Sequence, residues 1–182
     1  MALLFNEVAV SQVLDSRRDA VLDEIEKLDR DYLLKVSEAD LAAYLEKKYW
    51  LDVPVILDDQ IHVSHQRQGR PDVRERIEVT ISVPFEGDAE LFKVRPATFT
   101  TTRPRGVVQD QVLLLPFSPA TADGAALKDE YERELREIRQ YLDWLRQSVD
   151  EFNKGLDAVV RGRIQNRKKR LLDAAGMVAA LG

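Results

Sequence analysis

Two histidines and two aspartates lie close together in the run Asp58-Asp59-Gln60-Ile61-His62-Val63-Ser64-His65. Imidazole nitrogens and carboxylate oxygens are ligands that zinc and related metals take from proteins. The stretch has the pattern of a strand, however, and strand residues three apart face opposite sides of a sheet. His62 and His65 would therefore not converge on one ion. We expect no metal and no cofactor here, only a hairpin edge with exposed imidazoles.

Three carboxylates gather at a second place, Glu86-Gly87-Asp88 followed by Glu90. Such a group can bind a divalent cation or act as an acid and a base. Hairpin turns also collect Gly and Asp for conformational reasons alone. We favour the turn over the catalytic interpretation.

Motifs that would identify an enzyme are missing from the sequence. None of Ser64, Ser82 and Ser118 lies in a Gly-x-Ser-x-Gly motif, and no phosphate-binding loop or dinucleotide fingerprint occurs. The chain has no cysteine, which excludes disulfides, thiolate metal ligands and cysteine nucleophiles. We assign no catalytic residue, and a hydrolase with an unrecognised site stays an alternative.

A basic run near the C-terminus is the strongest candidate for contact with an anion. Residues 161–182 carry six Lys/Arg and one Asp on a chain whose net charge is −5. One helical face of this run can meet phosphates, so a nucleic-acid-binding module is the second functional hypothesis. The cations can instead pair with the acidic helices of residues 1–52, stabilise a helix C-terminus, or simply be solvated. The six are Arg161, Arg163, Arg167, Lys168, Lys169 and Arg170.

Arg95, Arg103 and Arg105 flank expected turns of the sheet. They could form an anion pocket with Arg67 or Arg70, but spacing alone does not show whether they meet.

Nine apolar residues of the C-terminal third follow an unbroken 4-3 spacing, which we call the seam. This spacing predicts a helix with a narrow apolar side that must be buried against another helix or a partner. It favours a non-enzymatic interaction or oligomerisation module, with a dimer or a protein partner covering the seam. The residues are Tyr131, Leu135, Ile138, Leu142, Leu145, Val149, Phe152, Leu156 and Val159.

The helix that carries the seam can be one rod or two. Unbroken from residue 125 to 175 it would be about 75 Å long. Asn153-Lys154-Gly155 is its weak point, since Asn-x-Gly can close one helix and release the next. A compact domain would prefer a turn at Gly155, so we slightly favour a helical hairpin. Asp123 is the expected N-cap.

Helices also precede the middle of the chain. Leu14, Val21, Ile25, Leu28 and Tyr32 predict one helix over Ser11–Lys35. Ser37 three residues before Asp40 begins a second, with Leu41, Leu45 and Tyr49 facing inward. Strands are predicted at 52–57 and 61–64 as a hairpin, and at 77–83, 91–95, 98–102 and 107–115.

Composition limits the protein class. Hydrophobic residues make up 45% of 182, enough for a core, and charged residues make up 32%, which suits solvated helices. No stretch reaches the ~18 apolar residues of a membrane span, and the start lacks a basic leader. We expect a cytoplasmic protein without membrane contact.

Three segments together resemble a known kind of protein: 83–99 (VPFEGDAELFKVRPATF), 127–135 (LKDEYEREL) and 141–145 (YLDWL). They are similar to the N-terminal, non-catalytic region of poorly characterised bacterial proteins that can carry a C-terminal effector domain. The resemblance rests on no catalytic motif and carries over no active-site residue. Together with the apolar ending 177–182, it implies that the chain is part of a longer protein.

The sequence therefore predicts an α+β fold. An antiparallel sheet of four or five strands, flanked by N-terminal helices, would form a domain over 1–122. A long helix or helical hairpin, resembling a coiled coil, would occupy 123–182.

Overall fold

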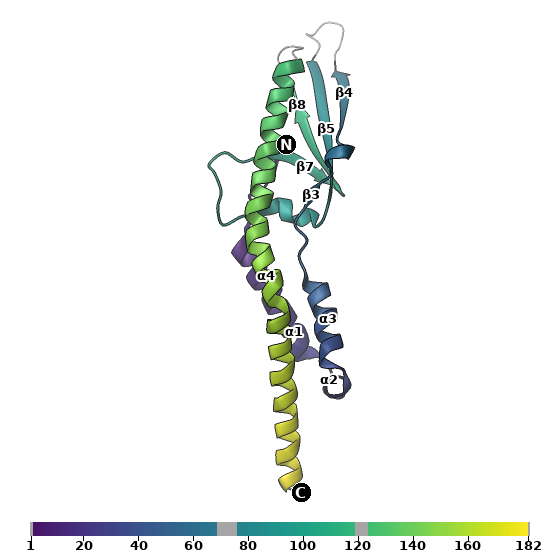
Figure 1. The fold of residues 1–182 in the computed structure, drawn as a ribbon, viewed down its shortest axis with the longest axis vertical. Coiled ribbons are helices and arrows are strands. Elements are labelled where there is room, and N and C mark those ends of the chain that lie inside the picture. Colours follow the sequence, from purple (N-terminus) through teal and green to yellow (C-terminus); the bar gives the residue numbers. More distant parts are fainter. Residues whose placement is uncertain (1, 69–75, 119–123, 182) are drawn as a thin grey trace. The chain divides into compact units, whose positions relative to one another are not determined.

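The computed structural model describes residues 2–68, 76–118 and 124–181, without the side chains of 65–68, 76, 77 and 181. The fold is α+β, with N-terminal helices, an antiparallel sheet and a long C-terminal helix, as predicted (Figure 1). The expected N-cap Asp123 lies outside the described residues. The helices are α1 (Val10–Lys27), α2 (Arg30–Lys35), α3 (Glu38–Tyr49) and α4 (Gly124–Leu181), with 3-10 turns η1 (Asp58–Gln60) and η2 (Ala89–Lys93). The strands are β1 (Ala2–Leu3), β2 (Val8–Ala9), β3 (Val55–Ile56), β4 (His62–Gln68), β5 (Arg76–Glu86), β6 (Val94–Arg95), β7 (Arg105–Gln109) and β8 (Val112–Phe117).

The sheet is organised around β5. Its order is β1-β7-β8-β5-β3, and β4 pairs with β5 as well. Alternate residues Val79, Ile81 and Val83 of β5 are buried, which confirms the predicted two-residue period. Pro84 lies within the strand, where it is paired with Val112 and its carbonyl accepts from the Leu57 N–H at 2.9 Å.

Four local predictions in the sheet are wrong. β3 and β4 form no hairpin with each other, since both pair with β5. The expected strand 107–115 is a hairpin of β7 and β8, turning at Asp110 with φ +51°, a conformation that Asp tolerates better than most residues. Residues 98–102 form a loop, and 91–95 divides between η2 and β6, which pairs in parallel with β2.

Helix α4 is continuous over 58 residues, so the preference for a hairpin at Gly155 is wrong. Asn153 explains why the helix does not end there. Its amide accepts from Leu51 N–H at 3.2 Å and donates to Leu51 C=O at 2.9 Å, and only 3% of the residue is exposed. The presumed helix breaker therefore anchors the helix to the chain after α3.

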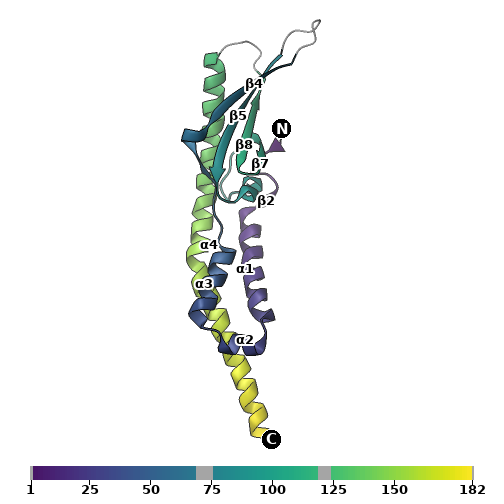
Figure 2. The same cartoon turned by 90° about the vertical axis from the view of Figure 1, so that its right-hand side faces the viewer.

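The chain forms two compact units, and α4 contributes to both. Unit 1 comprises residues 1–10 and 52–148, and unit 2 comprises 11–51 and 149–182. The expected division at residue 122 followed chain order, whereas the units follow packing. Within unit 1, the first part of α4 lies along the sheet, and within unit 2 its second part lies beside α1 and α3 (Figure 2).

Aromatic rings join α4 to the rest of unit 1. The Phe5 ring stacks on Tyr141 of α4 at 5.0 Å between centroids, and Phe92 lies 5.7 Å from Phe5 and 4.9 Å from Phe85. All four residues are buried. Such large side chains contribute much of a small core.

The N-terminal helical region of unit 2 is broken where the sequence predicted one helix. Asp29 caps α2 by accepting from the Tyr32 N–H at 2.9 Å. The break changes the inward face, so Leu33 is buried and Tyr32 is exposed. The α3 prediction is confirmed, because Ser37 caps the helix at the Asp40 N–H and its three expected core residues are buried.

No helix among the described residues is both long and apolar enough to cross a membrane.

We expect Leu145→Ala to lower the free energy of unfolding by about 2–5 kcal/mol, because truncating a fully buried leucine leaves a cavity. Urea denaturation measures this. Gln147→Ala, at an exposed position on the same helix, is the matched control and should stay within about 0.5 kcal/mol of the parent. Equal midpoints for the two variants would show that α4 is not packed in unit 1.

Candidate functional site

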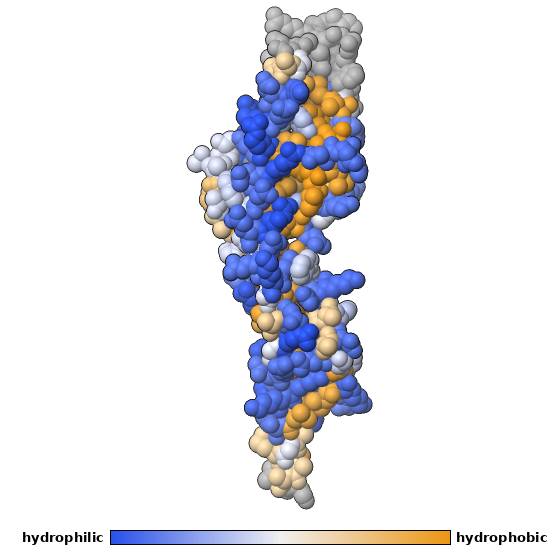
Figure 3. Space-filling view, in the orientation of Figure 1, coloured by the Kyte–Doolittle hydropathy of each residue, from blue (hydrophilic) through white to orange (hydrophobic). Residues whose placement is uncertain are grey.

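Two adjoining hollows lie along α4 in unit 1, and together we call them the α4 groove. The larger has a volume of about 430 Å³ and the smaller about 200 Å³. They meet at Asp58 and Arg139, which line both. Figure 3 shows apolar surface beside this part of α4. The remaining lining residues are Pro54, Val55, Ile56, Ile61, Tyr131, Glu132, Leu135, Arg136, Leu142, Asp143 and Arg146.

The groove runs along α4, which forms one of its walls. From Tyr131 to Arg146 the helix rises about 22 Å. The opposite wall is the segment from Pro54 to Ile61, with β3 and η1. Both β3 and β4 pair with β5 and with no other strand in the described part of the chain. The sheet edge is therefore open on this side.

Charged and apolar side chains both line the groove. Arg139 forms an ion pair with Asp58 across the groove. Arg146 binds Asp143 at 2.7 Å and donates to the Pro54 carbonyl at 3.3 Å. Arg136 has no hydrogen-bond or ion-pair partner among the described residues. Burial raises the pKa of Tyr131, so its hydroxyl stays protonated at neutral pH.

The structure places most of the seam inside the chain. Seven of its nine residues are buried, whereas Tyr131 is half-buried in the α4 groove and Val159 is also half-buried. Val160 and Ile164 are buried in place of Val159. A straight helix turns every 3.6 residues, so its buried face drifts away from a 3.5-residue repeat by about 20° per heptad.

The basic run serves the helices of its own unit. Arg163 and Arg170 bind Glu26 at 2.8 and 2.6 Å. Arg167 donates to the carbonyls of Ile25 and Leu28, and Lys168 to that of Val36 at 2.7 Å. These carbonyls lie at the C-terminal ends of α1 and α2, where a helix leaves acceptors unpaired.

The other two cations of the basic run, Arg161 and Lys169, differ from these four in their partners. Arg161 pairs with Asp157 one turn earlier, and the exposed Lys169 has no partner among the described residues. The sequence left two main alternatives for the basic run, contact with nucleic acid or pairing with the acidic helices of residues 1–52. The geometry shows the pairing.

A group of hydrogen-bonded polar side chains in unit 2 joins α1 to α3. Glu24 accepts from Lys48 at 2.7 Å and from the Tyr49 hydroxyl at 2.5 Å. Burial alone would raise the pKa of Glu24, but these two hydrogen bonds outweigh it and lower that pKa below its ordinary value. Burial, and then the bond to Glu24, raises the pKa of Tyr49.

Of the arginines that flank the turns of the sheet, the structure brings Arg95 and Arg103 to the same side chain, Phe99. The Arg95 and Arg103 guanidinium carbons lie 5.4 and 5.5 Å from the Phe99 ring centroid. Arg105 begins β7, and its backbone N–H donates to Glu134 of α4 at 2.6 Å. The side chain of Arg67, and all of Arg70, lie outside the described residues. Sequence spacing did not reveal Phe99 as their common contact.

The histidines and the carboxylate turn show no convergence in the described part. His62 is exposed, with its Nδ1 3.3 Å from the Gln60 carbonyl oxygen, and the His65 side chain is not described. Gly87 has φ +107°, as the turn requires. Asp88 accepts from the Glu90 N–H at 3.0 Å, and Glu90 pairs with Lys93, so both serve local structure.

Comparison of the chain with protein-family models, with curated protein sequences and with solved structures gives no match.

Stability should depend on pH through Glu24. A lowered carboxyl pKa stabilises the fold above the unfolded value of about 4.3, and this contribution disappears as the pH falls through the folded value. In urea denaturation we expect Glu24→Gln to be less stable than the parent at neutral pH, by about 1 kcal/mol or less. The two should converge once the pH falls below the lowered pKa of Glu24 in the folded protein.

Glu151→Gln is the control for this experiment, because Glu151 is exposed on α4 in the same unit. It should follow the parent at every pH. A constant gap between Glu24→Gln and the parent would show that the lowered pKa does not stabilise unit 2.

Tyr141 should hold the 98–102 loop through its hydroxyl, which accepts from the Thr100 N–H at 3.1 Å and donates to the Thr102 carbonyl at 3.1 Å. Tyr141→Phe keeps the ring and removes these bonds, so we expect a loss of about 1–3 kcal/mol and faster deuterium exchange at the Thr100 amide. NMR measures the rate of deuterium exchange at the Thr100 amide. Tyr131→Phe, with no described hydroxyl partner, should leave that exchange rate unchanged.

Proposed function

We propose that this chain is a non-enzymatic protein-interaction module, which binds an extended segment of a protein partner in the α4 groove of unit 1. The observation that carries the proposal is the groove itself, in which apolar and charged side chains both line a hollow beside an open sheet edge. Concave apolar surfaces with a few polar groups are typical of binding sites.

The dimensions favour an extended occupant. A strand rises about 3.3 Å per residue, so about 22 Å of groove accommodates six or seven residues. A segment along β3 could also bond to the backbone groups of that edge, as in binding by strand addition. Val55 of β3 is 54% exposed and offers apolar contact at the same place.

Charge narrows the chemistry of the partner segment. Arg136 is the groove cation without a described partner, and the exposed Arg139–Asp58 pair lies where the two hollows meet. A segment that alternates apolar and acidic residues would bury the former against Ile61 and present the latter to Arg136.

Two other hypotheses receive less support. Self-association through the seam would require a second copy to reach side chains that are already buried. Nucleic acid at the basic run would have to displace cations from Glu26 and from helix carbonyls.

The test is selection of peptides from a random display library on the whole chain, followed by calorimetry with synthetic peptides. We expect selected sequences to combine apolar and acidic residues. Ile61→Asp and Arg136→Glu should each weaken binding about tenfold or more, since each places a negative charge in the groove.

Lys154→Glu is the matched control, because it makes the same change of charge as Arg136→Glu at an exposed position of α4 in unit 2. It should not alter peptide affinity. Thermal melts confirm that all three variants fold. Failure to select any peptide, or affinities unaffected by the two groove variants, would contradict the proposal.

A further inference from the structure

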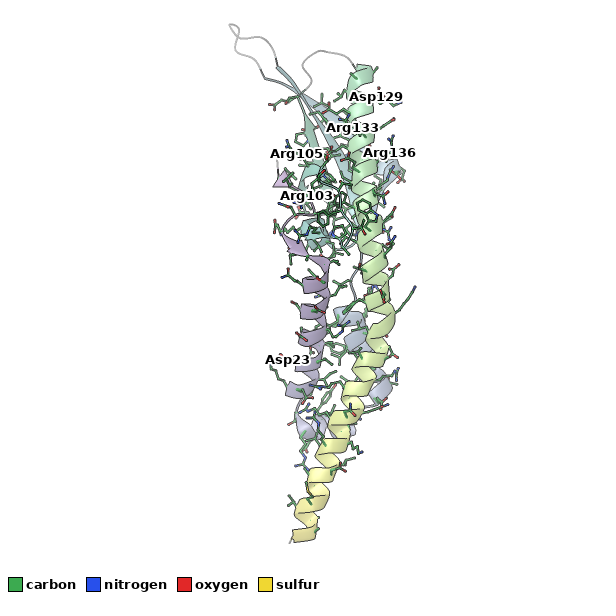
Figure 4. All side chains as sticks on the ribbon, turned by 90° about the vertical axis from the view of Figure 1, so that its left-hand side faces the viewer. Asp23, Arg103, Arg105, Asp129, Arg133 and Arg136 are labelled. Atoms are coloured by element: carbon green, nitrogen blue, oxygen red, sulfur yellow. The ribbon has the colours of Figure 1, made fainter. Side chains whose placement is uncertain are left out.

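A cluster of arginines on unit 1 is separate from the α4 groove and surrounds an aromatic ring. Arg95, from β6, and Arg103, from the loop before β7, both lie against Phe99. Phe99 nevertheless remains 47% exposed, so part of its ring is open to solvent. Figure 4 labels Arg103, Arg105 and Arg133 in this unit, with Asp129 near Arg133 on α4.

The side chains of these arginines form no ion pair among the described residues, although the Glu134 carboxylate accepts from the Arg105 backbone N–H at 2.6 Å. None of Arg95, Arg103, Arg105 and Arg133 has a carboxylate within ion-pair distance among the described residues. The Nε of Arg103 is buried and has no hydrogen-bond partner. In unit 2, by contrast, nearly every cation of the basic run has an acceptor. Cations gathered without acceptors indicate a surface that neutralises an external anion.

The Tyr141 side chain of α4 holds the loop that carries Phe99. Tyr141, only 1% exposed, bonds to the Thr100 N–H, the Thr100 carbonyl and the Thr102 carbonyl. Thr100 Oγ1 adds a bond to the Thr102 carbonyl at 2.6 Å. The Arg105 backbone is fixed to Glu134 of α4. A loop ordered in advance loses less entropy when it binds a ligand.

We propose that this arginine–phenylalanine cluster binds single-stranded nucleic acid, with its phosphates on Arg103, Arg105 and Arg133 and an unpaired base against Phe99. The inference is independent of the proposed peptide groove, since it uses different residues.

The chemistry favours this ligand over other anions. A guanidinium that stacks on a ring keeps its N–H donors in the plane, where they suit the paired oxygens of a phosphate. Cations that come from a strand, a loop and a helix suit several phosphates along a chain better than one isolated anion. The exposed half of Phe99 offers a stacking surface that a base in a duplex cannot reach.

The test is fluorescence anisotropy of the whole chain with a labelled oligothymidylate of about twelve nucleotides, titrated at several salt concentrations. The double variant Arg103→Ala/Arg105→Ala should reduce the slope of log affinity against log salt by about 1.4, or about 0.7 for each lost phosphate contact. Phe99→Ala should weaken binding about 5- to 150-fold. Melting curves and circular dichroism verify folding of each variant.

Lys169→Ala is the matched control, because it removes an exposed, unpaired cation from the basic run instead. Lys169→Ala should change neither the affinity nor the salt slope. If it weakened binding as much as the double variant does, the contact would lie in unit 2 and the proposal would be overturned. No binding at about 100 µM protein in low salt would also overturn it. The proposal would likewise be overturned if thymidine monophosphate, a duplex or a polyglutamate peptide bound as tightly as the oligothymidylate or more tightly, because that would identify another class of ligand.

Discussion

One apolar stripe on α4 supplies core to both compact units, and much of the structure depends on its burial. The buried side chains from Leu135 to Leu145 lie in unit 1, and those from Val149 to Ile164 lie in unit 2. Most of the stability of a helix in a protein comes from the packing of its apolar face, so this burial stabilises the 58-residue helix in both units. Asn153 is the polar exception, and it is tolerated because Leu51 satisfies both ends of its amide.

Cations have different roles in the two units. In unit 2 the arginines and Lys168 of α4 satisfy carbonyls that α1 and α2 leave unpaired at their ends. In unit 1, Arg95 and Arg103 lie against Phe99 and have no ion-pair partner among the described residues. A count of charges along the sequence draws attention to the basic run, yet most of its cations are already paired within unit 2. Net charge alone therefore does not locate a binding surface.

Local signals in the sequence predicted local structure well. The Ser37 cap, the inward face of α3 and the alternation in β5 each depend on neighbouring residues, and each is confirmed. Features that depend on distant residues were missed. Asn-Lys-Gly looked like a helix end because its partner Leu51 lies far away in the chain. The groove could not be seen either, since its walls are separated by about seventy residues and only β5 brings the open edge beside α4.

The division of each unit along the chain has a consequence for folding during synthesis. Residues 11–51 require residues 149–182 to complete their core, but the 97 residues from 52 to 148 are made in between. At roughly 5–20 residues per second, the ribosome takes about 5–20 s over that interval. The apolar side chains that α4 contributes to this core, from Val149 to Ile164, are synthesised only after that interval. Residues 1–52 meanwhile carry twelve acidic and seven basic side chains, and this like charge opposes aggregation of nascent chains before their own helix arrives.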